Sequence, residues 1–160
     1  MQTKKVFFAA SILFSFALGT LPNFSAGQDT ATKKPLLRAI DHIALNVKDL
    51  NASMHFYSTI LGLEEIPAAA AGRKWLKIND GLQLHLLGER QLELVQNKNI
   101  HMAFRSSNLD ELIQQLDAKQ INWGSFRGEN RTISASRNDG VRQIFFQDPD
   151  GYWIEVNDAK

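Results

Sequence analysis

The stretch that decides the fold is QDPDGYWIEVN, residues 147–157. Its turn, Asp148 to Gly151, contains a proline with fixed φ, two aspartate acceptors and a glycine that tolerates positive φ, which together predict a tight reversal. Aromatic and β-branched residues follow, and they predict a strand. Glu155 lies inside that strand. A carboxylate at such a position needs solvent or a cation beside it, because a bare buried charge is too costly.

The same pattern occurs in a weaker form at residues 79–86, NDGLQLHL. When Gly81 is aligned with Gly151, both segments continue as an apolar strand. In this alignment His85 takes the position of Glu155, four residues after the glycine.

A second pair of similar segments supports the same alignment. Residues 41–45 read DHIAL, residues 100–104 read IHMAF, and a helical pattern follows each. This pairing aligns His42 with His101. We infer that the chain is internally duplicated.

Each half has the pattern of a strand, a helix and three further strands. For the first half we expect strands at 39–47, 63–67, 73–78 and 82–87, and a helix from about 50 to 61 that Asp49 or Asn51 caps and Gly62 stops. For the second half we expect strands at 101–105, from 123, at 141–147 and at 152–157. Its helix carries Leu109, Leu112, Ile113 and Leu116, and Asn108 caps it. The predicted fold class is α+β, with two βαβββ modules at 38–88 and 100–157.

The N-terminal segment is predicted to be a signal peptide, residues 1–27. It begins with a short basic stretch, continues with an apolar one that is too short and interrupted for a membrane span, and ends in the small residues Ser25, Ala26 and Gly27. Residues 28–37 are polar and predict a flexible lead-in. The 160-residue chain has no cysteine, which fits export without a disulfide framework. We therefore expect a periplasmic or secreted protein with no membrane segment after the signal is removed.

Charge excludes one large class of partners. The chain has 18 Lys and Arg against 17 Asp and Glu, and the predicted signal holds Lys4 and Lys5 but no acid. The chain that follows the predicted signal is nearly neutral and has no basic patch interleaved with aromatic residues. This composition argues against nucleic-acid binding.

The histidines point to a metal site. If the helix of each module covers one face of its sheet, strand alternation places three histidines and one carboxylate on the opposite faces. A lone strand histidine is usually a hydrogen-bonded core residue, but equivalent positions in a repeat favour a shared role. Neutral imidazole and carboxylate suit a divalent ion such as Zn, Ni, Co, Mn or Fe. The predicted ligands are His42, His85, His101 and Glu155.

The duplicated βαβββ pattern, DHIAL at 41–45, Phe56-Tyr57 in the first helix, and DPDG at 148–151 leading to Glu155 together resemble the vicinal oxygen chelate superfamily. That superfamily includes glyoxalase I, methylmalonyl-CoA epimerase, fosfomycin-resistance thiol transferases, extradiol dioxygenases and bleomycin-resistance proteins. The resemblance covers about residues 38–157, and the family's metal positions correspond to the four predicted ligands. Glyoxalases typically carry Glu and epimerases Gln where this chain has His85.

The resemblance implies a metal-dependent lyase or isomerase whose ion binds a small oxygenated substrate and stabilises an oxyanion or enediolate. Glu155 would then act both as a ligand and as the catalytic proton shuttle. Residues on the ligand faces are candidates for substrate binding: Asn46, Gln83, Arg105 and Trp153.

Two alternative functions come from other members of the family. A ring-cleaving dioxygenase would bind Fe(II) through two histidines and Glu155, but a fourth ligand would occupy a position that O₂ or substrate needs. A non-catalytic ligand-binding protein of the bleomycin-resistance type commonly lacks the metal ligands that this chain has.

Two βαβββ modules can pair within one chain or with a second copy. We expect a homodimer, in which His42 and His85 of one subunit join His101 and Glu155 of the other.

Overall fold

The computed structural model describes residues 36–134 and 137–160. The predicted signal peptide, 1–27, and most of the predicted lead-in, 28–37, lie outside the described residues. Leu37–Lys160 forms one compact unit. Among the described residues, no helix is long and apolar enough to cross a membrane.

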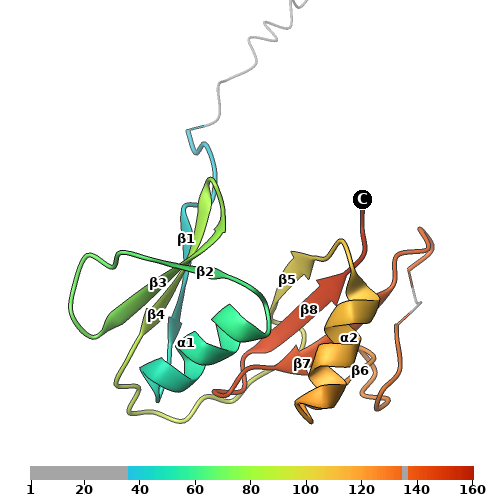
Figure 1. The fold of residues 1–160 in the computed structure, drawn as a ribbon. Coiled ribbons are helices and arrows are strands. Elements are labelled where there is room, and N and C mark those ends of the chain that lie inside the picture. Colours follow the sequence, from blue (N-terminus) through green and yellow to red (C-terminus); the bar gives the residue numbers. More distant parts are fainter. Residues whose placement is uncertain (1–35, 135–136) are drawn as a thin grey trace, which may run out of the picture. The chain divides into compact units, whose positions relative to one another are not determined.

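The unit consists of two βαβββ modules, which confirms the predicted fold class (Figure 1). The first contains β1 (His42–Asn46), α1 (Leu50–Thr59), β2 (Glu64–Ile66), β3 (Arg73–Asn79) and β4 (Leu82–Leu87). The second contains β5 (His101–Arg105), α2 (Leu109–Ala118), β6 (Trp123–Gly124), β7 (Gln143–Gln147) and β8 (Trp153–Asn157).

The two sheets have the same topology, with strand orders β1-β4-β3-β2 and β5-β8-β7-β6. In each sheet the first strand is parallel to the last, and the other pairs are antiparallel. Ala44 pairs with His85 in the first sheet, and Ala103 pairs with Glu155 in the second. His85 and Glu155 therefore hold equivalent positions, as the alignment through the two glycines predicts.

Side-chain caps set where the helices begin. Asp49 accepts hydrogen bonds from the backbone N–H groups of Asn51 and Ala52, so Asp49 is the cap of α1. Asn108 caps α2 through the N–H of Glu111, as predicted. Helix α1 ends at Thr59, two residues before the predicted end. Gly62 has a φ of +66° and turns the chain towards β2.

Strand β1 begins at His42, although the sequence predicts a strand from residue 39. Its ladder with β4 covers only His42–Asn46. Ile40 lies before that ladder and is exposed. Apolar residues alone do not make a strand where no neighbouring strand is available to pair with.

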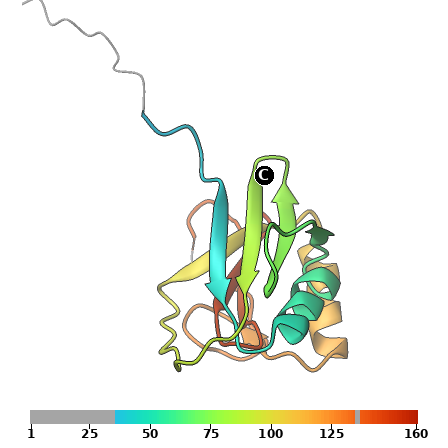
Figure 2. The same ribbon diagram turned by 90° about the vertical axis from the view of Figure 1, so that its left-hand side faces the viewer.

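The core lies between the helices and the covered faces of the sheets, and Figure 2 shows β1, β4 and β3 side by side with α1 next to them. Both modules contribute to one buried cluster of apolar side chains, which includes Leu45, Leu84, Leu86, Leu112, Leu116, Ile144, Ile154 and Val156. Burying this face leaves the opposite sheet faces, which carry the predicted ligands, free for chemistry.

The turn at residues 148–151, here called the inter-module turn, is fixed by the first module. Asp148 accepts a hydrogen bond from the hydroxyl of Tyr57 at 2.8 Å. Asp150 accepts three hydrogen bonds, from the backbone N–H of Lys48 at 2.8 Å, the hydroxyl of Ser53 at 3.0 Å and the guanidinium of Arg90 at 2.7 Å. The turn that begins the last strand is thus also a polar junction between the modules.

Acid should weaken the inter-module turn through Asp150. Burial acts to raise the pKa of Asp150, but hydrogen bonds from Arg90, Lys48 and Ser53 outweigh it and hold that pKa below its usual value. Its contribution to stability is therefore complete above about pH 3.9 and is lost as the pH falls through the lower pKa of the folded chain.

Asp148 acts in the opposite direction, because burial raises its pKa. An Asp148→Asn variant isolates the effect of Asp150. We expect its melting temperature to fall as the pH is lowered from about 4 to 2, and the fall to be smaller in Asp148→Asn/Asp150→Asn. Equal acid sensitivity of the two variants, measured by thermal melts followed by circular dichroism, would contradict this assignment.

Candidate metal centre

His101 on β5 and Glu155 on β8 form the first half of the candidate centre. The Nε2 atom of His101 lies 3.2 Å from Oε2 of Glu155. The Nδ1 atom of His101 lies 2.8 Å from the carbonyl oxygen of Lys98, and since a carbonyl only accepts, Nδ1 carries a proton. In the neutral imidazole, Nε2 therefore directs a lone pair at a carboxylate oxygen, an arrangement that requires a proton or a cation between them.

The distance between these two atoms suits a shared metal ion. Ligand bonds of 2.0–2.2 Å with angles between the octahedral and tetrahedral values separate two donor atoms by about 2.8–3.6 Å. The His101–Glu155 distance of 3.2 Å falls within that range. Glu155 is buried, and its other oxygen accepts a hydrogen bond from Asn157 at 2.7 Å. Asn157 thus holds the carboxylate in place, as hydrogen-bonding neighbours do for the carboxylate ligands of metal ions.

His42 on β1 and His85 on β4 form the second half. Their rings stack at 4.1 Å with an interplanar angle of 13°, and the Trp75 ring stacks on the other face of His85 at 4.2 Å. The Nδ1 atom of His42 is 2.8 Å from the Asp41 carboxylate, which leaves Nε2 of His42 for a metal. A carboxylate partner of this kind orients a metal-binding imidazole and increases its basicity.

His85 is held differently. Its Nε2 atom lies 2.9 Å from the side-chain oxygen of Gln83, which only accepts, so this nitrogen carries a proton. The lone pairs of two parallel imidazoles do not converge on one point, and joint ligation with His42 would need one ring to rotate. Burial, and then the neighbouring His42, lower the pKa of His85, which favours the neutral ring.

The structure does not bring the two halves together within one chain. In residues 36–134 and 137–160, no group of three or more His, Cys, Asp or Glu side chains gathers closely enough to hold a metal ion. His42 and His85 belong to the first sheet, and His101 and Glu155 to the second. A complete four-ligand centre, and its formation between two copies, stay predictions.

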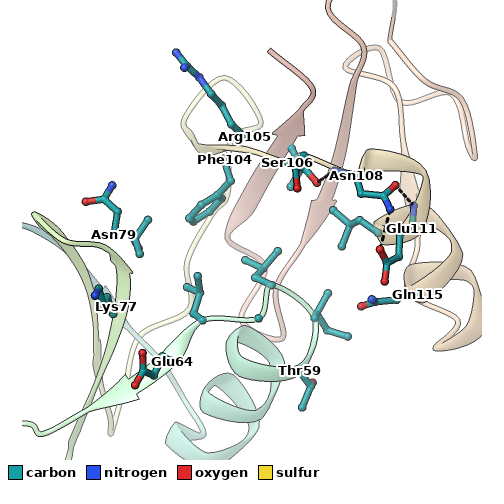
Figure 3. Close-up of a pocket in the computed structure, with 18 of the residues that line it drawn as sticks. Thr59, Glu64, Lys77, Asn79, Phe104, Arg105, Ser106, Asn108, Glu111 and Gln115 are labelled. Atoms are coloured by element: carbon teal, nitrogen blue, oxygen red, sulfur yellow. Dashed lines mark hydrogen bonds between the residues drawn. The ribbon is translucent and has the colours of Figure 1, made fainter. Parts of the chain in front are cut away.

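The predicted substrate-binding residues lie in different surroundings. Asn46 donates to the backbone oxygen of Leu87, and Gln83 is engaged by His85. Arg105 lies at the rim of a cavity of ≈ 1000 Å³ between the C-terminal end of α1 and the start of α2 (Figure 3). Trp153 lines a separate cavity beside His101 and Glu155. Trp153 is therefore the member of this set that lies closest in the fold to the carboxylate–imidazole pair.

Sequence reasoning missed three residues that shape these surroundings. Trp75 covers His85, Phe145 meets the ring of His101 edge-on at 5.4 Å, and Lys98 supplies the carbonyl that fixes His101.

Comparison with known proteins gives a consistent result. Residues 39–156 match the family model described as Glyoxalase/Bleomycin resistance protein/Dioxygenase superfamily. Glyoxylase I 4 of Arabidopsis thaliana is 26% identical over 129 residues, which cover 75% of this chain and 70% of the plant protein. Metallothiol transferase FosB of Staphylococcus epidermidis is 29% identical over 133 residues, which cover 76% of this chain and 82% of FosB.

Solved structures agree with these matches. A glyoxalase family protein from Bacillus anthracis superposes with a TM-score of 0.64 at 25% identity, covering 80% of this chain and 100% of that protein. The fosfomycin resistance protein FosX of Listeria monocytogenes gives a TM-score of 0.63 at 24% identity, covering 78% of this chain and 96% of FosX. The second match supports the fold alone.

Proposed function

Because the chain belongs to the Glyoxalase/Bleomycin resistance protein/Dioxygenase superfamily, we propose that it is a metal-dependent lyase or isomerase acting on a small oxygenated substrate. The observation that carries this proposal is the position of Nε2 of His101, which lies 3.2 Å from a carboxylate oxygen of Glu155. Both side chains are oriented by further hydrogen bonds, as metal ligands are.

The proposed ion is held by residues of two copies of the chain. His101 and Glu155 come from one copy, and His42 with its neighbour His85 comes from the other. Exposure supports this arrangement, because the side of β1 that carries His42, Ala44 and Asn46 is exposed in the single chain. If a second copy covered this face, His42 of one copy would lie next to the His101–Glu155 pair of the other.

When bound, a divalent ion would polarise a substrate oxygen as a Lewis acid. The chain's own residues supply the other functions. Oε2 of Glu155 faces His101 and would hold the ion, whereas Oε1 accepts from Asn157 and keeps a further lone pair that can accept a substrate proton and return it to a neighbouring atom. Phe145 packs against His101 and keeps water from that side of the pair.

Substitution of the paired residues should remove the metal. We expect His101→Ala and Glu155→Gln to weaken metal binding by more than about 100-fold, since orienting partners alone typically contribute 10–100-fold. Elemental analysis of natively purified protein measures the bound metal. The matched control is His55→Ala, because His55 lies on exposed surface of α1 and faces neither pair.

Metal identity also tests the reaction class. Zinc, nickel, cobalt or manganese supports the lyase or isomerase proposal. Iron(II), together with oxygen uptake in the presence of a catechol, would instead assign the chain to the ring-cleaving dioxygenases. Metal retained at the wild-type level in Glu155→Gln contradicts the proposed site itself.

A further inference from the structure

A second cavity, of ≈ 360 Å³, lies next to the candidate metal centre in the second module. We call it the Lys98 cavity. Its lining includes Lys98, Ser125, Phe145 and Trp153, together with the polar residues Asn122, Asn130 and Gln147. Its volume is at the small end of the range for ligand pockets, which suits a molecule of roughly a dozen non-hydrogen atoms.

The Lys98 cavity and the His101–Glu155 pair share one face of the second sheet. Trp153 pairs in register with His101, and Phe145 pairs in register with Glu155. Phe145 also meets the His101 ring directly. A ligand in this cavity is therefore separated from the pair by the depth of one side chain.

The ammonium of Lys98 is incompletely satisfied. It lies 4.2 Å from the centre of the Trp153 ring and 6.0 Å from that of Phe145, and it donates to the backbone oxygen of Ser125 at 3.3 Å. An ammonium has three donors, and this one forms no ion pair with any carboxylate of the described residues. Burial lowers the pKa of Lys98, which reflects a cation partly removed from water without an opposite charge.

Aromatic walls and one unpaired cation define the ligand chemistry. Phe145 and Trp153 border the cavity with aromatic rings, and Phe126 packs edge-on against Phe145, whereas the Trp123 side chain lies in the core and donates to Asp117. Such walls favour a planar apolar body. The ammonium favours an oxyanion that can accept a charge-assisted hydrogen bond.

We propose that the Lys98 cavity binds the substrate, and that the substrate is a small aromatic carboxylate. Its carboxylate binds Lys98, and its ring lies against Trp153. The role of this carboxylate as the substrate rests on the proposed function, but the anion pocket itself depends only on the cavity and Lys98.

The test uses two probes that differ by one charge, phenylglyoxylate and its neutral methyl ester. Isothermal titration calorimetry of the full, metal-loaded chain measures both affinities. We expect the acid to bind about 10- to 100-fold more tightly than the ester, the range for one hydrogen bond between charged groups. In Lys98→Met this preference disappears, whereas Lys98→Arg retains it.

The matched control is Lys119→Met, which removes an exposed lysine at the end of α2 and leaves the preference unchanged. Equal binding of acid and ester by the wild-type chain, no binding of the acid, or an unchanged preference in Lys98→Met each overturns the proposal. Elemental analysis separates the two proposals. A chain purified without metal refutes the proposed function, and an acid preference that depends on Lys98 in that same chain still supports the anion pocket.

Discussion

Asp150→Ala should lower the melting temperature by about 10 °C or more, the largest stability effect that we expect from one substitution outside the apolar core. Asp150 and Arg90 form an ion pair at 2.7 Å, and their side chains are only 3% and 4% exposed. Removing the carboxylate leaves the guanidinium buried without its partner. It also removes the acceptor that Ser53 and the backbone of Lys48 use.

Thermal melts followed by circular dichroism measure this effect, and the chain contains a matched control. Asp80 belongs to the equivalent turn of the first module, but it is 98% exposed and pairs with Lys77 on the surface. Asp80→Ala should therefore change the melting temperature by no more than about 2 °C. Equal melting temperatures of Asp150→Ala and Asp80→Ala would contradict the stabilising role of the buried ion pair.

A double substitution adds a second check on the buried pair. Arg90→Met/Asp150→Ala removes both charges, so no buried ion is left unpaired. Its melting temperature should be well above the value expected if the decreases caused by Arg90→Met and Asp150→Ala were added.

Two variants that cannot bind metal alone should recover binding when they are combined. In a heterodimer of a His42→Ala chain with a Glu155→Gln chain, one of the two sites carries both substitutions and the other carries neither. We expect such a heterodimer to bind about half the metal of the wild-type dimer, while each variant alone binds almost none.

Co-expression with two different affinity tags, sequential purification and elemental analysis measure this recovery. A heterodimer of the Glu155→Gln chain with a His101→Ala chain is the matched control. His101 and Glu155 lie on the same module, so each site of that dimer lacks one of them, and no recovery is expected. Equal recovery in both heterodimers, or none in either, would refute a centre formed between copies.

The order of elements and the equivalence of the two sheets could be predicted from sequence. Alternation over residues 82–87 and 101–105 gave strand bounds that agree with β4 and β5. The alignment of Gly81 with Gly151 predicted the matching positions of His85 and Glu155 because the ladder register follows the turn. These features depend on neighbouring residues in the sequence, so periodicity and turn residues predict them.

The composition of the site was harder to predict from the sequence. Alternation places His42, His85, His101 and Glu155 on sheet faces, but it does not say which faces meet. The stack of Trp75 on His85 depends on the register between β3 and β4. Lys98 lies in the linker between the modules, where no periodic pattern exists to assign a direction to its side chain.

The two turns that reveal the duplication have diverged in what they do. At Asn79-Asp80-Gly81 the side chain of Asn79 only closes its own turn, by accepting from the N–H of Gly81. In the second turn Asp150 is aligned with Asp80 and Asp148 with Ile78, and the carboxylates of Asp148 and Asp150 accept hydrogen bonds from Tyr57 and Arg90. The halves are consequently no longer interchangeable. A tandem of two first modules would place Ile78 where Asp148 accepts from Tyr57, so the symmetry that the two sheets share is lost at this turn.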